Sequence, residues 1–167
     1  MTKQERLDIV RKEVQSPINI DAYNNYTSIR DNTNCMAYAI GATFPELSMY
    51  RLGAISDSKS LDEPYYSTQE LIKLLYKDLD VLGLKYEKVF NDESIKKIDS
   101  NQYIIKLYAL VFADGRIGDF HFIRYDNNGK WTEKRSRQYA GEMYDCHRYD
   151  KDWMYHHLIM LKITRKG

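Results

Sequence analysis

The chain has 167 residues, 43% of them hydrophobic and 29% charged, which is the composition of an ordinary soluble globular protein and predicts one domain spanning residues 1–167. Its 25 Lys and Arg residues against 24 Asp and Glu leave a net charge of +1, which argues against a nucleic-acid partner or an anionic membrane surface.

The sequence predicts no targeting segment. No apolar run approaches the ~18 residues that cross a bilayer, and residues 1–6 are charged and lack the apolar segment of a secretory signal. Two cysteines are too few for a disulfide framework. We therefore expect a cytoplasmic protein with reduced thiols and no membrane association, and the sequence predicts no particular oligomeric state.

In chain order, the first elements predicted are helical. Residues 2–14 form an amphipathic helix with an apolar face made of Leu7, Ile9, Val10 and Val14. A polar loop is expected through Asn34, followed by a short helix that starts at Cys35 and ends at Gly41. Residues 45–66 are expected to be an irregular connection.

A longer helix is predicted next. Ser67-Thr68-Gln69-Glu70 is a capping-box pattern, and Gly83 is placed to end the helix that it starts. Residues 84–90 are expected to form a strand, and residues 91–98 a polar turn of helix. The apolar stripe of the long helix consists of Leu71, Ile72, Leu74, Leu75, Leu79 and Leu82.

The pattern changes to β-structure from residue 102. Strands are predicted at 103–112, 119–125, 131–137 and 155–164, with a loose polar stretch before the last of them. Helices followed by an antiparallel sheet define an α+β fold class.

Cys35 is the first candidate for chemistry. A thiolate is the nucleophile of thiol enzymes, and the unpaired N–H groups at a helix start are expected to lower the pKa of a thiol placed there. Asn32, Thr33 and Asn34, just before it, are residue types that cap a helix. The alternative is a buried structural cysteine, because free Cys is among the most buried residue types.

His121 is the second candidate, although a lone strand histidine can be purely structural. Asp126-Asn127-Asn128-Gly129-Lys130 fits a hairpin with a three-residue loop and Gly129 in the left-handed conformation, which places His121 opposite Arg135. Glu133 is then a diagonal neighbour on the same face and can orient the imidazole. A two-residue turn at Asn128-Gly129 would put Glu133 on the other face, and Asp119 is the competing orienting residue.

These two segments, residues 34–40 and 119–131, resemble the nucleophile and histidine blocks of small bacterial papain-superfamily cysteine peptidases, nearest to the NlpC-type cell-wall endopeptidases. The resemblance covers roughly residues 30–137. It implies a papain-like fold in which a Cys opens a helix packed on an antiparallel sheet, a His follows on a later strand, and the next strand supplies the orienting residue. Glu133 departs from the family, whose orienting residue is usually His, Asn, Asp or Gln.

The function expected is a cysteine peptidase or amidase without a cofactor, acting on a peptide or protein through an acyl-enzyme at Cys35. His121 would act as base and acid, and the backbone N–H of Cys35, with the Asn32 or Asn34 amide, would hold the oxyanion. Three alternatives stay open. They are a transglutaminase, deamidase or acyltransferase at the same site, a non-catalytic binding protein, and a metal-dependent hydrolase built on Asp145-Cys146-His147 and His156-His157, whose spacing fits no common zinc pattern.

Overall fold

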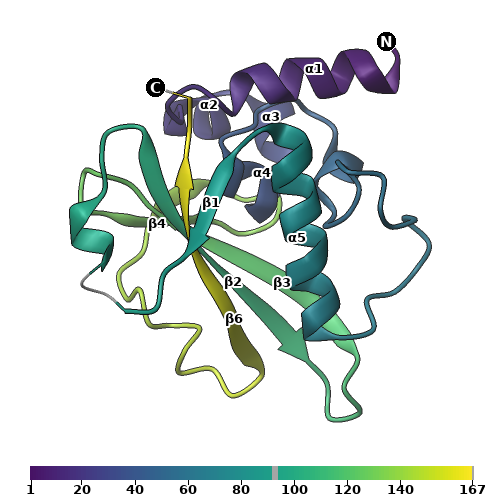
Figure 1. Cartoon of the computed structure of the whole chain (residues 1–167), viewed down its shortest axis with the longest axis vertical. Coiled ribbons are helices and arrows are strands. Elements are labelled where there is room, and N and C mark those ends of the chain that lie inside the picture. The colour runs from purple at the N-terminus through teal and green to yellow at the C-terminus, as the bar shows by residue number, and fades with distance from the viewer. Residues whose placement is uncertain (92–93, 167) are drawn as a thin grey trace.

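A computed structural model describes residues 1–91 and 94–166 and has one six-stranded antiparallel sheet with helices packed on it, which confirms the α+β class (Figure 1). The strand order across the sheet is β1-β6-β2-β3-β4-β5. The strands are β1 (Lys85–Lys88), β2 (Gln102–Val111), β3 (Ile117–Tyr125), β4 (Trp131–Lys134), β5 (Ala140–Glu142) and β6 (Tyr155–Thr164).

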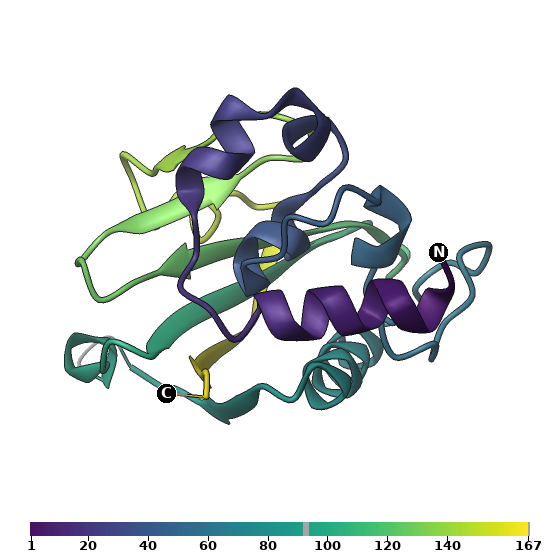
Figure 2. The same ribbon diagram turned by 90° about the horizontal axis from the view of Figure 1, so that it is seen from above.

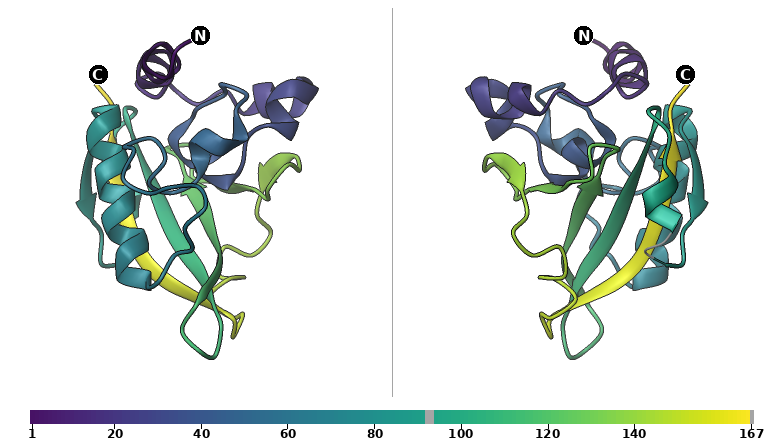
Figure 3. Two further views of the ribbon diagram at one scale, coloured as in Figure 1. Left: turned by 90° about the vertical axis from the view of Figure 1, so that its right-hand side faces the viewer. Right: turned by 90° about the vertical axis from the view of Figure 1, so that its left-hand side faces the viewer.

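The main core lies between one face of the sheet and the helices. Figure 1 shows α5 (Thr68–Leu82) running across this face, and Figure 3 shows it from the side, with α1 (Lys3–Glu13) above the sheet. Val10 and Val14 from the first helical segment meet the leucines of α5 and the inward side chains of β2 and β6 in one apolar cluster. None of the helices in the described ranges is long and apolar enough to cross a membrane.

The predicted long helix α5 begins and ends at its predicted capping residues. Ser67 Oγ accepts a hydrogen bond from Glu70 N at the start of α5, and Gly83 ends that helix at φ +71°. The Glu70 carboxylate accepts from Tyr66 N instead of completing the capping box at Ser67. Ile9, expected on the buried face of α1, is exposed.

The segment between α1 and Cys35 was expected to be a loop, and that expectation is wrong. It contains two short helices, α2 (Ile20–Asn25) and α3 (Thr27–Asp31), which Figure 2 shows beside the β4–β5 end of the sheet. Asn19 caps α2, and Tyr23 packs edge-on against Tyr38 in a small separate core. Helices of five or six residues depend on such contacts more than on their own sequence, so periodicity does not reveal them.

The His121 hairpin has the predicted register. Ile123 pairs with Glu133 and Tyr125 with Trp131, and Gly129 closes the three-residue loop at φ +80°. The return strand β4 ends at Lys134 and not at the predicted residue 137. β5, in the stretch expected to be loose, was not predicted.

The connection at 45–66 contains the short 3-10 helix η1 (Leu47–Tyr50). The turn expected at 91–98 contains the 3-10 helix η2 (Ser94–Lys97), and residues 92–93 lie outside the described ranges.

Candidate active site

Cys35 is the first residue of the short buried helix α4 (Cys35–Ile40). Asn34 fixes this start in two ways, because its side-chain oxygen accepts from Ala37 N at 3.1 Å and its amide donates to Tyr50 O at 3.0 Å. Gly41 ends the helix at φ +75°, as the sequence predicts. Both ends of α4 are therefore held by hydrogen bonds or by backbone conformation, and the Cys35 side chain has a defined position.

The sulfur of Cys35 lies against β3. The helix that carries Cys35, α4, packs beside β3. β3 pairs with β4 over Ile123–Tyr125, so the β3 residues before Ile123 lie outside that pairing. The thiol contacts Phe120 O, with 3.8 Å between Sγ and the carbonyl oxygen. Cys35 is thus placed next to the strand segment that carries His121.

Burial has a stronger effect on the thiol than the helix start does. Loss of solvent raises the pKa of Cys35 from 9.0 to about 12, while the Phe122, Met36 and Cys35 N–H groups lower it by less. The expectation of a lowered pKa at Cys35 is therefore wrong for the resting protein. A nucleophile at this position needs a base that removes its proton.

His121 is buried and is held by Glu133 of the neighbouring strand. The distance from His121 Nε2 to Glu133 Oε1 is 2.9 Å. Burial alone would raise the pKa of Glu133, but hydrogen bonds from His121 and Tyr149 outweigh it and leave that pKa below its ordinary value. An ionised carboxylate only accepts hydrogen bonds, so Nε2 donates a proton in this contact and Nδ1 is the ring nitrogen that Glu133 leaves unbound.

Tyr149 is a further member of this group that the sequence analysis missed. Its hydroxyl donates to the same Glu133 Oε1 at 2.7 Å, and its ring lies 4.5 Å from the His121 ring, centroid to centroid. Tyr149 comes from the loop between β5 and β6, so no local pattern links it to the hairpin. It fixes the carboxylate and covers one face of the imidazole.

A pocket of about 420 Å³ brings most of the predicted site residues together. Cys35, His121, Asn34 and Asp119 all line it, and Tyr149 lines it as well. Asn32 does not line it, and its amide donates to Ser28 O at 2.8 Å. Of the two predicted amide donors, Asn34 is the one at the pocket. The roles of both in holding an oxyanion stay predictions.

Asp119 lies in the pocket without contacting the imidazole nitrogen that Glu133 binds. Its Oδ1 accepts from Phe120 N at 2.8 Å. Burial raises the pKa of Asp119, and its negative charge adds to the increase in the pKa of Cys35. The geometry therefore favours Glu133 over Asp119 as the residue that orients His121.

Lys134 supports the chain just before Cys35. Its ammonium group is buried and donates to three carbonyl oxygens, those of Arg30, Thr33 and Ser136, each at 2.7 Å. Burial lowers the pKa of Lys134 to about 8. Residues 134–137 contain three basic residues, and the sequence pattern alone does not distinguish the lysine among them that points inward.

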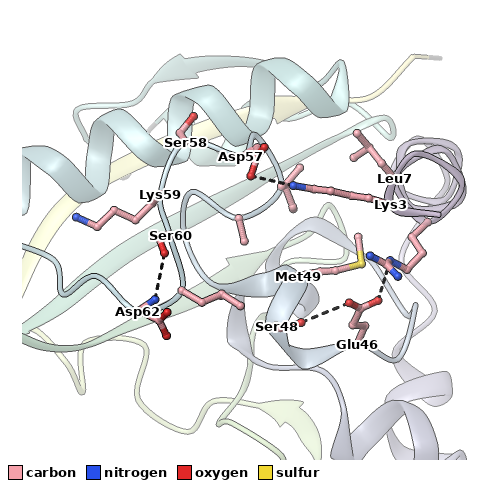
Figure 4. A pocket seen from close by; sticks show the side chains of 14 residues that line it. Lys3, Leu7, Glu46, Ser48, Met49, Asp57, Ser58, Lys59, Ser60 and Asp62 are labelled. Carbon is pink, nitrogen blue, oxygen red and sulfur yellow. Dashed lines mark hydrogen bonds and ion pairs between the residues drawn. The ribbon is translucent and has the colours of Figure 1, made fainter. Parts of the chain in front are cut away.

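A second, larger cavity of about 690 Å³ lies between α1 and the segment 46–62 and shares no lining residue with the first (Figure 4). Four of its charged side chains form two ion pairs. Lys3 Nζ lies 3.0 Å from Asp57 Oδ1, and Arg6 Nε lies 3.1 Å from Glu46 Oε2. In each of these two pairs the opposite charges balance.

The alternative metal site consists of Asp145-Cys146-His147 and His156-His157. Within residues 1–91 and 94–166, no group of three or more His, Cys, Asp or Glu side chains is arranged to hold a metal ion.

Comparison of the chain with protein-family models, curated proteins and solved structures gave no match. The functional argument therefore depends on the site itself.

Proposed function

We propose that this protein is a cysteine-dependent hydrolase that cleaves an amide or isopeptide bond of a peptide or protein. The observation that carries the proposal is that Cys35 lines the same pocket as His121, whose Nε2 is held 2.9 Å from Glu133 Oε1. A nucleophile, a base and an orienting acid are the three parts of a thiol-hydrolase site. A papain-like fold, as the resemblance in the sequence implies, is part of this proposal.

The first half of the reaction forms a thioester. Cys35 Sγ attacks the carbonyl carbon of the substrate while His121 Nδ1 takes the thiol proton, and the resulting imidazolium is stabilised by Glu133. The N–H groups of Cys35 and Met36 face the sulfur, and the Cys35 N–H is the natural donor to the developing oxyanion. Collapse of the tetrahedral intermediate breaks the C–N bond, and His121 gives its proton to the leaving amine.

The second half of the reaction restores the enzyme. Water attacks the thioester while His121 takes a proton from it, the C–S bond breaks to release a carboxylic acid, and His121 returns the proton to the Cys35 sulfur. An amine in place of water would give acyl transfer by the same steps, so transglutaminase or acyltransferase activity is a variant of this proposal. A thiol nucleophile must stay reduced, so the proposal includes a reducing compartment such as the cytoplasm.

The burial of Cys35 favours one competing function. A thiol that is 5% exposed, with its pKa raised to about 12, is also what an inert structural cysteine looks like, as in a non-catalytic binding protein. The two functions differ in whether His121 controls the reactivity of the sulfur.

Alkylation by iodoacetamide at pH 7 tests the proposal. We expect Cys35 to react faster than Cys146 in the native protein, and His121→Ala to slow Cys35 about 10²-fold by removing its base. His156→Ala, at an exposed histidine of β6, is the matched control and leaves the rate unchanged. If Cys35 reacts no faster than Cys146 and His121→Ala changes nothing while circular dichroism shows an intact fold, the thiol is structural and the proposal is wrong.

A further inference from the structure

The pocket beside Cys35 contains two arginine side chains that the reaction described above does not use. Arg51 and Arg135 line it from different elements, Arg51 after η1 and Arg135 directly after β4. Arg51 and Arg135 are far apart in the sequence, and neither belongs to the site predicted from it. Their position beside the nucleophile raises the question of what negative group they meet.

Arg51 is held in place without an acidic partner. Its guanidinium lies over the Tyr65 ring, 4.6 Å from the centroid, and one Nη donates to Glu63 O. Its Nε is buried and has no hydrogen-bond partner among residues 1–91 and 94–166. A fixed guanidinium with donor capacity left over is well suited to bind a carboxylate.

The loop around Arg51 is itself anchored. Buried Asp78 of α5 accepts from Gly53 N at 2.7 Å and from Ser56 N at 2.9 Å, which holds the chain directly after Arg51. Binding a ligand at Arg51 would therefore require little ordering of the loop, and preorganisation of this kind improves affinity.

Arg135 is exposed and its charge helps to lower the pKa of Glu133, but in the described part of the chain no hydrogen bond or ion pair holds its side chain. The pocket lining holds two arginines against a single aspartate, Asp119, which leaves an excess of one positive charge. A pocket whose lining carries more positive than negative charge favours a negatively charged occupant.

We propose that the substrate of this site carries an acidic side chain, Asp or Glu, next to the scissile amide, and that Arg51 and Arg135 bind its carboxylate. The inference rests on the proposed function, because the pocket matters only if Cys35 reacts there. It names the class of substrate as an acidic peptide segment, which the catalytic residues alone leave undefined.

The test compares two alkylating agents that differ in one group, iodoacetate with a carboxylate and iodoacetamide with a neutral amide. The readout is the ratio of their rates at Cys35, divided by the same ratio for N-acetylcysteine amide in solution. We expect this normalised ratio to be about tenfold in the native protein and to fall towards one in Arg51→Gln, in Arg135→Gln and furthest in the double variant. High salt should reduce the preference as well.

Two further variants separate charge from packing. Arg51→Lys keeps the charge while changing the contact with Tyr65, and should retain most of the preference. Arg137→Gln removes a nearby exposed arginine that does not line the pocket, and should retain all of it. A preference that survives the double Gln variant, or that Arg137→Gln abolishes, would overturn the assignment.

The two proposals fail in different ways. If Cys35 reacts readily with iodoacetamide but shows no preference for iodoacetate, the acidic substrate is wrong and the thiol hydrolase stands. If Cys35 of the folded protein reacts with neither reagent, the proposed function fails and the acidic substrate fails with it.

Discussion

The Glu133 carboxylate contacts the His121 imidazole across the β3–β4 hairpin, with 2.9 Å between Oε1 and Nε2. The two residues are diagonal neighbours, since Ile123 is the residue that pairs with Glu133. This contact leaves Nδ1 as the ring nitrogen that Glu133 does not bind, and it is the atom that the proposed mechanism uses as the base.

Glu133→Gln tests the contact. Glutamine keeps the size of the side chain and removes the charge that stabilises an imidazolium, so we expect alkylation of Cys35 by iodoacetamide at pH 7 to slow about 10- to 100-fold. Glu142→Gln, at an exposed glutamate of β5, is the matched control and should react at the native rate. Equal rates in both variants would remove Glu133 from the mechanism.

Tyr149→Phe tests the second hydrogen bond to the same carboxylate oxygen. Phenylalanine retains the ring that packs on His121 but not the hydroxyl that donates to Glu133 at 2.7 Å. We expect a loss of about 1 kcal/mol in the free energy of unfolding and a several-fold slower reaction of Cys35. Tyr144→Phe changes a fully exposed tyrosine of the same loop and should change neither quantity. A Tyr149→Phe protein that matches Tyr144→Phe in both would show that the hydroxyl has no role.

How far the sequence could predict this site depends on how local each signal is. The turn residues Asn127, Asn128 and Gly129 are contiguous, so they specify the loop, the register and the position of Glu133. Gly41 and Gly83 likewise end the helices that they were expected to end. These signals need only a few neighbouring residues to act.

The parts that the sequence did not reveal depend on contacts between distant residues. Tyr149 reaches Glu133 from a loop, Lys134 contacts carbonyls about a hundred positions earlier, and Arg51 approaches the pocket from the connection after η1. The pKa of Cys35 also could not be inferred, because burial by the whole fold outweighs the local effect of the helix start. The short helices α2 and α3 belong to the same class, since tertiary packing stabilises them.

Lys134 gives a prediction for the pH dependence of stability. Burial lowers its pKa to about 8 from the ordinary 10.5, so between these pH values the unfolded chain binds a proton that the folded protein has released. The free energy of unfolding contributed by this group therefore rises as pH increases through that window, and the cost of burying the charge is fully present below pH 8.

Urea unfolding of the native protein and of Lys134→Met at several pH values checks this. Methionine does not titrate, so the stability of the native protein relative to the variant should increase from pH 7 to pH 10. A difference that stays constant or decreases over this range would show that Lys134 keeps its ordinary pKa in the fold. Lys130→Met, at an exposed lysine of the hairpin loop, serves as the control and should show no such trend.

The most direct test of the account is whether an acyl group forms on Cys35 with the help of His121. Reaction of the native protein with p-nitrophenyl acetate should give a burst of p-nitrophenol stoichiometric with protein, with the acetyl group located on Cys35 by mass spectrometry. Cys35→Ser and His121→Ala should lack the burst. Slow linear release in the native protein, equal to that of Cys35→Ser and without acetylated Cys35, would contradict the assignment of this site as the active site of a cysteine hydrolase.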